Sequence, residues 1–374
     1  MKDTMKPEWT PENSGEEFAC TVMPGVEKTD AHTVNIKHTV IRKARQLTVD
    51  EYVEGILTHN RTLFARAITL VESNSVHHIE QAQEVIKKIL PHTGKSIRIG
   101  ITGVPGAGKS TFIESFGLFL IELGFKVAVL AIDPSSTISK GSVLGDKTRM
   151  EELSRREEAF IRPSPSSGTL GGVTRKTRET ILLCEAAGFD VILVETVGVG
   201  QNEVSVRSMV DFFLLILISG AGDELQGIKK GVIEIADAIL VNKADGDNII
   251  KAKAAAAEYN MALHYLAEST AGWKTHAFTC SAREKLGINE IWNVIKKFES
   301  ITQTNGYFEE RRQMQMIEWL HSMLEEHILN EFFNHTAVKN CLPHITSEIL
   351  NGKLPPTAAV HKVLETYNKF KSGQ

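Results

Sequence analysis

One short segment constrains the fold of this chain more than any other. Residues 103–110 read Gly-Val-Pro-Gly-Ala-Gly-Lys-Ser, which matches the pattern G-x-x-x-x-G-K-[ST]. The apolar run 97–102 precedes the segment, and apolar residues at helical spacing follow it. Glycines let such a loop wrap around phosphate groups with its N–H groups pointing inward, at the positive end of a helix dipole. The segment therefore predicts a strand, a phosphate-binding loop and a helix within an α/β domain.

Two side chains at the end of this loop predict chemistry at the terminal phosphates of a nucleotide. The Lys109 ammonium group can place a positive charge beside the β- and γ-phosphates, and the Ser110 hydroxyl can coordinate Mg2+. We therefore expect Lys109 to be catalytic and Ser110 to be a metal ligand. The expected nucleotide contacts of the loop are Gly103, Val104, Pro105, Gly106, Ala107, Gly108, Lys109, Ser110 and Thr111.

A magnesium site of this kind needs a carboxylate, which a parallel sheet places at the C-terminal end of a strand. Asp133 follows the candidate strand 126–132, and Glu195 ends the candidate strand 190–195. We expect both residues to be catalytic and to hold the metal. Gly198, three residues beyond Glu195, is expected to present its backbone N–H to the γ-phosphate from a switch loop. Candidates for the residue that positions the attacking water are Arg149, Arg175, Gln201 and Lys229.

A second loop predicts which base is bound. Asn242, Lys243 and Asp245 form an N-K-x-D pattern directly after an apolar run. The Asp245 carboxylate can accept two hydrogen bonds from guanine, whereas adenine offers no such donor pair and would leave the carboxylate unpaired. Lys243 is expected to lie along the base, Asn242 to tie this loop to the phosphate loop, and Ser281 and Ala282 to lie beside the guanine carbonyl oxygen. The pattern predicts GTP as substrate and GDP as product.

Apolar runs alternate with helical patterns along the middle of the chain, which is typical of a mostly parallel sheet. The candidate strands are 97–102, 126–132, 190–195, 212–218, 238–242 and 277–281. Thr48 and Glu51 have the spacing of a capping box at a helix N-terminus. Near the C-terminus, Ile317, Leu320, Leu324 and Ile328 form an apolar helical stripe. We predict an N-terminal leader and helical region at 1–95, a nucleotide-binding G domain at 96–300, and a C-terminal helical region at 301–374.

The composition of the chain argues against several classes of protein. Its formal net charge of −4 leaves no basic excess for binding nucleic acid. Its four cysteines lie far apart with no C-x-x-C pair, which favours reduced thiols in a cytosol-like compartment. No run approaches about 18 consecutive apolar residues, so we expect no membrane-spanning helix. Residues 1–17 are acidic and contain no arginine, which argues against a transit peptide and predicts a cytoplasmic protein.

Six further segments make the chain resemble the metallochaperone-type group of phosphate-loop GTPases, in which a glutamate such as Glu195 replaces the usual aspartate. The resemblance is closest to the MeaB/MMAA subfamily, also called ArgK-like, and runs from about Thr48 to the C-terminal helices. The segments are 133–136 (DPSS), 145–150 (GDKTRM), 162–165 (RPSP), 168–173 (GTLGGV), 195–201 (ETVGVGQ) and 222–229 (GDELQGIK).

This resemblance implies a GTPase chaperone of the adenosylcobalamin-dependent enzyme methylmalonyl-CoA mutase. GTP hydrolysis would be coupled to cobalamin loading and to protection or reactivation of the mutase, and a cobalamin adenosyltransferase is a further candidate partner. The metal residues carry over to Ser110, Asp133, Asp146 and Glu195. The resemblance also implies a homodimer formed through C-terminal helices, which makes residues 301–374 a dimerisation arm.

Other functions remain as alternatives. A nickel-delivery GTPase for hydrogenase or urease maturation would need exposed metal ligands, but the only adjacent histidines are His77 and His78. A kinase or ATPase linked to amino-acid transport would prefer ATP, contrary to Asp245. A scaffold that only holds nucleotide is a third alternative, against which Lys109 and Ser110 argue.

Direct binding of cobalamin would need its own motif. Asp30 and His32 begin the pattern D-x-H-x-x-G, but Asn35 stands where the pattern requires glycine. We therefore expect adenosylcobalamin on the partner enzyme only.

Overall fold

The computed structural model describes residues 45–132, 150–163, 170–196, 203–220 and 230–371. The chain divides into two units, Met1–Gln46 and Leu47–Gln374, and every element below belongs to the second. The predicted positions Asp133, Asp146, Arg149, Gly198, Gln201 and Lys229 lie outside the described residues, as do Asp30, His32 and Asn35.

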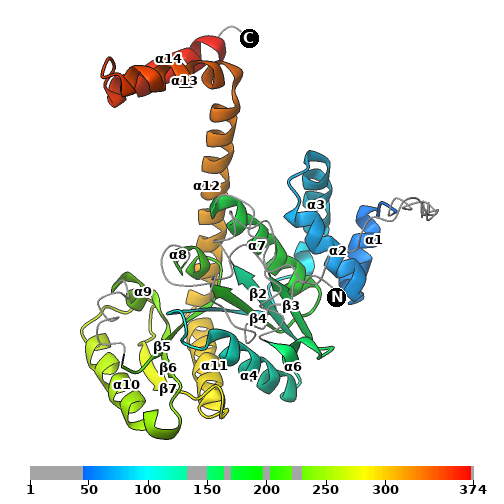
Figure 1. Cartoon of the computed structure of the whole chain (residues 1–374). Coiled ribbons are helices and arrows are strands. Elements are labelled where there is room, and N and C mark those ends of the chain that lie inside the picture. Colours follow the sequence, from blue (N-terminus) through cyan, green and yellow to red (C-terminus); the bar gives the residue numbers. More distant parts are fainter. Residues whose placement is uncertain (1–44, 133–149, 164–169, 197–202, 221–229, 372–374) are drawn as a thin grey trace, which may run out of the picture. The chain divides into compact units, whose positions relative to one another are not determined.

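The described part of the chain contains a seven-stranded parallel sheet with the order β3-β2-β4-β1-β5-β6-β7 (Figure 1). The strands are β1 (Ile97–Gly103), β2 (Val127–Ile132), β3 (Ala159–Pro163), β4 (Val191–Thr196), β5 (Phe212–Ile218), β6 (Ala238–Asn242) and β7 (His276–Thr279). Continuous apolar runs such as β5 are buried on both faces, as parallel strands require. The predicted α/β phosphate-loop fold is confirmed.

One strand was not anticipated from the sequence. The other six strands match the candidate runs to within two residues at each end, whereas β3 was missed. It has five residues, and Pro163 ends it. Because β3 lies at the edge of the sheet, it pairs only with β2 and tolerates a residue without an N–H group. Its short apolar run therefore resembles a loop when the sequence is considered alone.

Helices cover both faces of the sheet. In Figure 1, α4 (Lys109–Glu122) and α11 (Ile288–Thr304) lie on one side of the strands, and α7 (Leu170–Ala186) and α8 (Glu203–Arg207) lie on the other. The remaining elements of this part are α6 (Glu151–Ser154), α9 (Lys230–Ile235), α10 (Ile249–Leu263) and the short 3-10 helices η1 (Leu90–His92) and η2 (Gly246–Asn248).

Three helices precede the sheet: α1 (Val49–Leu57), α2 (Arg61–Glu72) and α3 (Val76–Ile89). The capping box predicted for α1 is present, because the Thr48 side chain accepts from the Glu51 N–H and the Glu51 carboxylate accepts from the Thr48 N–H. Helix α2 packs against α7 and buries Phe64, whose ring centroid lies 4.8 Å from that of Phe160 on β3. These helices therefore share the hydrophobic core of the sheet.

Three helices follow the sheet: α12 (Tyr307–Asn334), α13 (Thr336–Leu350) and α14 (Pro356–Lys371). A small second core, built on Val338, Ile345, Ala359 and Val363, holds α13 and α14 together. The helical pattern predicted for residues 301–374 is present as these three helices, and α14 starts with Pro356 at its first position. Proline is favoured there because its missing N–H group would be unpaired in any case. The predicted boundaries near residues 95 and 300 stay predictions.

No helix in the described ranges is long and apolar enough to cross a membrane.

Candidate functional site

The phosphate loop connects β1 to α4 and adopts a backbone that only glycine tolerates well. Gly103, Gly106 and Gly108 have φ angles of +154°, +78° and +85°. A Cβ atom on Gly103 would lie 2.0 Å from the carbonyl oxygen of Ile216 on β5, and one on Gly108 would lie 2.7 Å from Nδ2 of Asn242. The loop is therefore pressed against the neighbouring strand on one side and against the N-K-x-D loop on the other.

Lys109 begins α4 and folds over the phosphate loop. Its Nζ donates to the carbonyl oxygens of Gly103 at 2.8 Å and Val104 at 3.3 Å. Burial lowers the pKa of Lys109, and the Glu195 carboxylate acts in the opposite direction. The lysine thus provides a positive charge that backbone carbonyl groups hold at the mouth of the loop.

Ser110 and Glu195 meet although they are far apart in the sequence. The Ser110 Oγ donates to Oε1 of Glu195 at 3.4 Å. The β1–β4 register sets Ile101 opposite Glu195, and Thr196 Oγ1 donates to Thr102 Oγ1 at 2.8 Å. Two hard oxygen ligands therefore lie together beside the loop, which suits Mg2+ completed by phosphate oxygens and water. Among the residues described, no group of three or more His, Cys, Asp or Glu side chains could hold a metal ion.

Asn242, the last residue of β6, joins three segments. Its Nδ2 donates to the Ala107 carbonyl oxygen at 2.8 Å, and its Oδ1 accepts from the Ala282 N–H at 3.1 Å. The side chain is buried, so both backbone groups depend on this amide for a partner. Lys243, which follows, has a φ of +60° and turns the chain away from the strand. Asn242 thereby holds the phosphate loop and the residue 280–282 segment in one assembly.

Asp245 is held by the segment that follows β7. Ser281 Oγ donates to Asp245 Oδ2 at 2.5 Å and accepts from the Glu284 N–H at 3.1 Å. Ser115 of α4 supports the same segment, because its Oγ donates to the Ala282 carbonyl oxygen at 2.6 Å. The sequence indicated Ser281 only as a neighbour of the base, and it contained no signal for Ser115, a lone serine on the buried face of a helix.

The structure thus brings together every described member of the predicted site. The segment at 103–111, Glu195, the segment at 242–245 and the segment at 281–282 lie at the C-terminal ends of β1, β4, β6 and β7. This is the edge at which parallel α/β sheets bind ligands. Arg175, a candidate for positioning water, lies half-buried on α7. Burial lowers the pKa of Lys176 and the Arg175 charge lowers it further, whereas burial raises the pKa of Glu179 and Arg175 acts in the opposite direction.

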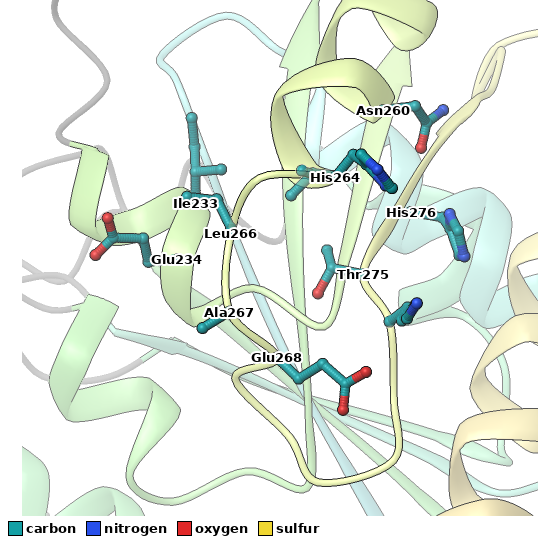
Figure 2. A pocket seen from close by; sticks show the side chains of 11 residues that line it. Ile233, Glu234, Asn260, His264, Leu266, Ala267, Glu268, Thr275 and His276 are labelled. Carbon is teal, nitrogen blue, oxygen red and sulfur yellow. The ribbon is translucent and has the colours of Figure 1, made fainter.

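A separate cavity of about 370 Å3 lies between α9, α10 and the start of β7 (Figure 2). His264 and His276 lie on one side of it and Glu234 on the opposite side. The strand end that lines the cavity is the N-terminal end of β7, whereas the predicted site uses the C-terminal ends. None of the predicted site residues lines this cavity.

Comparisons with known proteins agree with this geometry. The family model described as methylmalonyl Co-A mutase-associated GTPase MeaB matches residues 64–337. GTPase ArgK of Escherichia coli is 46% identical over 320 residues, which cover 86% of this chain and 97% of that protein. The Mus musculus protein named methylmalonic aciduria type A homolog, mitochondrial, is 45% identical over 332 residues, which cover 86% of this chain and 80% of that protein.

A solved structure gives the same result at the level of the fold. The crystal structure titled LAO/AO transport system kinase has 40% sequence identity and a TM-score of 0.70, covering 87% of this chain and 99% of that chain. The phosphate loop, the N-K-x-D loop and the extent of these matches lead to one conclusion. The chain is a GTPase that belongs to the MeaB family of methylmalonyl Co-A mutase-associated GTPases.

Proposed function

We propose that this GTPase is a chaperone of adenosylcobalamin-dependent methylmalonyl-CoA mutase and couples GTP hydrolysis to cobalamin loading and to protection or reactivation of the mutase. The family description supports the choice of partner. The observation that carries the proposal is the pair of hydrogen bonds that Asn242 makes to Ala107 and Ala282, because they join the phosphate loop and the guanine-reading segments into one unit. Such a unit can report the state of the nucleotide to a partner protein.

The roles of the site residues form part of this proposal. Phosphoryl transfer depends on positioning and on neutralising charge, so a covalent nucleophile is not required. Lys109 exchanges its two carbonyl acceptors for the β- and γ-phosphates, and Asp245 accepts from guanine beside Ser281. Ser110 and Glu195 hold Mg2+, which would neutralise phosphate charge when bound. Asp133 and Asp146 as further metal residues, and Gly198 as a γ-phosphate contact, stay predictions from the sequence.

We also propose a homodimer formed through the C-terminal helices. Ile317, Leu320 and Leu324 on α12 are each about half exposed, at 50%, 52% and 48%. These residues belong to the apolar stripe predicted from the sequence, and such a stripe is stabilised when a partner covers it. The cytoplasmic location stays a prediction, and the Mus musculus and Caenorhabditis elegans relatives carry the word mitochondrial in their names.

A binding experiment with exchanged nucleotides tests the proposal. The full chain is loaded with GDP or with a non-hydrolysable GTP analogue and used to capture methylmalonyl-CoA mutase. In a second measurement, binding of adenosylcobalamin by the mutase is followed by absorbance in the presence of each loaded form. We expect the amount of captured mutase and the rate of adenosylcobalamin binding to differ between the two nucleotides. Equal binding in both states would overturn the coupling.

The variant Asp245→Asn supplies a matched control for that experiment. It should respond to the xanthosine analogue in place of the guanosine analogue, because the amide reverses one donor–acceptor pair with the base. If the variant captures the mutase differently with the xanthosine analogue than with GDP, the effect is attributed to this site. If the variant still captures the mutase in a way that depends on the guanosine analogue, the proposal is contradicted.

A further inference from the structure

Buried polar atoms without hydrogen bonds gather at one junction of this molecule. Within the described residues, seven buried side-chain nitrogen or oxygen atoms have no hydrogen-bond partner, and six of them belong to residues on α7, α8 and α12. The six atoms are Arg178 Nε, Arg207 Nη1, Arg311 Nη1, Arg311 Nη2, Gln315 Oε1 and Trp319 Nε1. Arg311 Nη2 forms an ion pair with Asp237 Oδ2 at 3.5 Å, and Arg207 also pairs with Asp237, so in the described part of the chain the atoms around Arg178 are the ones without any partner. Native proteins leave few such atoms, so a cluster of them requires an explanation.

Helix α8 connects this junction to the nucleotide site. It is the first described element after Thr196, the residue that follows Glu195 on β4. It also packs on β1, the strand that leads into the phosphate loop. A Cβ atom on Gly100 of β1 would lie 3.0 Å from Cγ1 of Val206 and 2.9 Å from Cγ2 of Val210. Helix α8 therefore packs on β1, which leads into the phosphate loop, and on β4, which carries Glu195.

Arg178 of α7 bridges α8 and α12. Its Nη2 donates to Ser208 Oγ at 2.8 Å, just beyond the end of α8, and its Nη1 donates to the Gln315 carbonyl oxygen on α12 at 2.9 Å. Gln315 completes the bridge, because its Nε2 donates to the Val210 carbonyl oxygen at 2.8 Å and to that of Arg207 at 3.4 Å. The end of α8 is thus attached to α12 through one guanidinium group and one amide.

Arg312 on α12 is a fully paired arginine close to this bridge. Arg312 donates to both carboxylate oxygens of Asp211, at 2.8 and 2.6 Å, and to the carbonyl oxygens of Gly94 and Ser96, each at 2.7 Å. Every nitrogen of Arg312 has a partner, so this contact anchors the first turns of α12 in one position. The Arg178 bridge, one turn further along α12, is only partly paired.

The unpaired atoms around Arg178 are complementary. Arg178 Nε and Trp319 Nε1 are donors, and Gln315 Oε1 is an acceptor. Trp319 lies one helical turn after Gln315, and the Arg178 guanidinium carbon is 5.7 Å from the centroid of the Trp319 ring. A half-paired network of this kind can gain hydrogen bonds by a small rearrangement, whereas a fully paired one can only lose them. The junction therefore leaves two donors and one acceptor available for further hydrogen bonds.

We propose that Arg178 is a positioning residue for GTP hydrolysis, which holds α8 against α12 and transmits the position of α8 to α12 at Trp319. The inference rests on the nucleotide site proposed above, because α8 follows the strand of Glu195. Trp319 stands where α12 begins to expose its apolar stripe, between Ile317 and Leu320. The bridge thus gives the nucleotide site a physical connection to the surface that a partner would cover.

Fluorine NMR on the full chain, labelled with 5-fluorotryptophan, measures this connection directly. The chain has four tryptophans, and the signal of Trp319 is assigned as the one lost in Trp319→Phe. We expect the Trp319 signal to differ between GDP and a non-hydrolysable GTP analogue. The same difference should be lost in Arg178→Gln, and kcat should fall about tenfold with KM nearly unchanged, since a tenfold rate change corresponds to one modest interaction at the transition state.

Two further variants separate loss of the bridge from misfolding and from a general effect of removing an arginine. Ser208→Ala removes the hydroxyl that accepts from Arg178 just beyond the end of α8 and that donates to the Ser205 carbonyl oxygen. It should reduce the nucleotide-dependent shift of Trp319 without unfolding the chain, even if Arg178→Gln folds poorly. Arg155→Gln removes an exposed arginine that pairs with Glu151 on α6, and it should leave both the shift and kcat unchanged. A Trp319 signal that ignores the nucleotide, or an Arg178→Gln chain with full shift and full kcat, would overturn the inference.

Failure of this inference can be told apart from failure of the nucleotide site. Affinity for GDP, measured by calorimetry, should be unchanged in Arg178→Gln and Ser208→Ala because neither residue faces the loops that hold the nucleotide. Lys109→Ala should bind GDP more weakly while the Arg178 bridge is unchanged, so its loss of affinity tests the nucleotide site independently of the bridge. A loss of GDP affinity in Ser208→Ala would contradict a role limited to hydrolysis, because it would show that the bridge also supports nucleotide binding.

Discussion

The side-chain amide of Asn242 donates a hydrogen bond of 2.8 Å to the carbonyl oxygen of Ala107, across 135 residues of sequence. The same amide accepts from the Ala282 N–H, so a single residue at the end of β6 sets the distance between the phosphate loop and the base-reading segments. A nucleotide spans both regions. The geometry of this amide therefore determines how well the two regions can be occupied together.

Removing that amide should weaken binding of guanine nucleotides. Asn242→Ala leaves a buried carbonyl group and a buried N–H group without partners, at about 1–3 kcal/mol for each group. We expect GDP affinity to fall at least tenfold in calorimetry. Asn351→Ala, on the exposed turn after α13, is the matched control and should bind GDP normally. Unchanged GDP affinity in Asn242→Ala would refute the role assigned to this bond.

Changing the base-reading carboxylate should change the substrate rather than abolish turnover. Asp245→Asn replaces an acceptor with a donor facing the base, which suits xanthine better than guanine. We expect kcat/KM for GTP to fall by about 100-fold or more, with recovery on xanthosine triphosphate, since sites built for a hydrogen bond discriminate strongly. Steady-state phosphate release with both nucleotides measures the change. Undiminished GTP turnover would contradict the assignment.

A methyl group at Gly108 should disturb the contact between the two loops. Its Cβ would lie 2.7 Å from Asn242 Nδ2, and its φ of +85° is unfavourable for alanine. Gly352→Ala is the matched control, because Gly352 has a φ of +67° and no atom within 4 Å of the added group. We expect the control to lose about 1 kcal/mol of unfolding free energy from strain alone. Gly108→Ala should lose GDP affinity in addition to stability. Equal GDP affinity in the two variants would show that the contact between residue 108 and Asn242 has no effect on binding.

Glu179 on α7 predicts a pH-dependent stability. Burial raises the pKa of this carboxyl to about 7, and Arg175, Gln83 and Lys176 act in the opposite direction. The folded chain therefore binds a proton that the unfolded chain has released between about pH 4.5 and 7. The free energy of unfolding associated with this group is greatest below that window and falls as the pH rises through it.

Glu179→Gln should remove that dependence. The new amide oxygen can still accept from Gln83 Nε2, which now donates to Oε1 of Glu179 at 3.1 Å. The variant should have a higher free energy of unfolding than the unchanged chain at pH 8, where burial of the ionised Glu179 is unfavourable. We expect this difference to be about 2 kcal/mol larger at pH 8 than at pH 5, from the usual conversion of a pKa shift. Urea denaturation at both pH values measures it, with the exposed Glu157→Gln as control. A gain that is equal at the two pH values would contradict the raised pKa.

Much of the site could be predicted from the sequence because its chemistry is local. The loop at 103–110 and the loop at 242–245 each contain their functional groups within a few consecutive residues, and each follows an apolar strand. Glu195 was identified for the same reason, as a carboxylate at a strand end. These signals depend on residue type and spacing, which folding does not alter.

Contacts between distant segments required the tertiary structure. The order of the strands differs from their order in the sequence, with β1 between β4 and β5, so sequence spacing did not show that Ser110 meets Glu195 or that Ser115 supports Ala282. The edge strand β3 was missed because a short apolar run that ends in a proline has a weak local signal. The sequence by itself determined that this chain binds a guanine nucleotide at strand ends. Only the packed structure decided which side chains bind the loops to one another and connect them to α12, because those hydrogen bonds exist only once the sheet has brought their partners together.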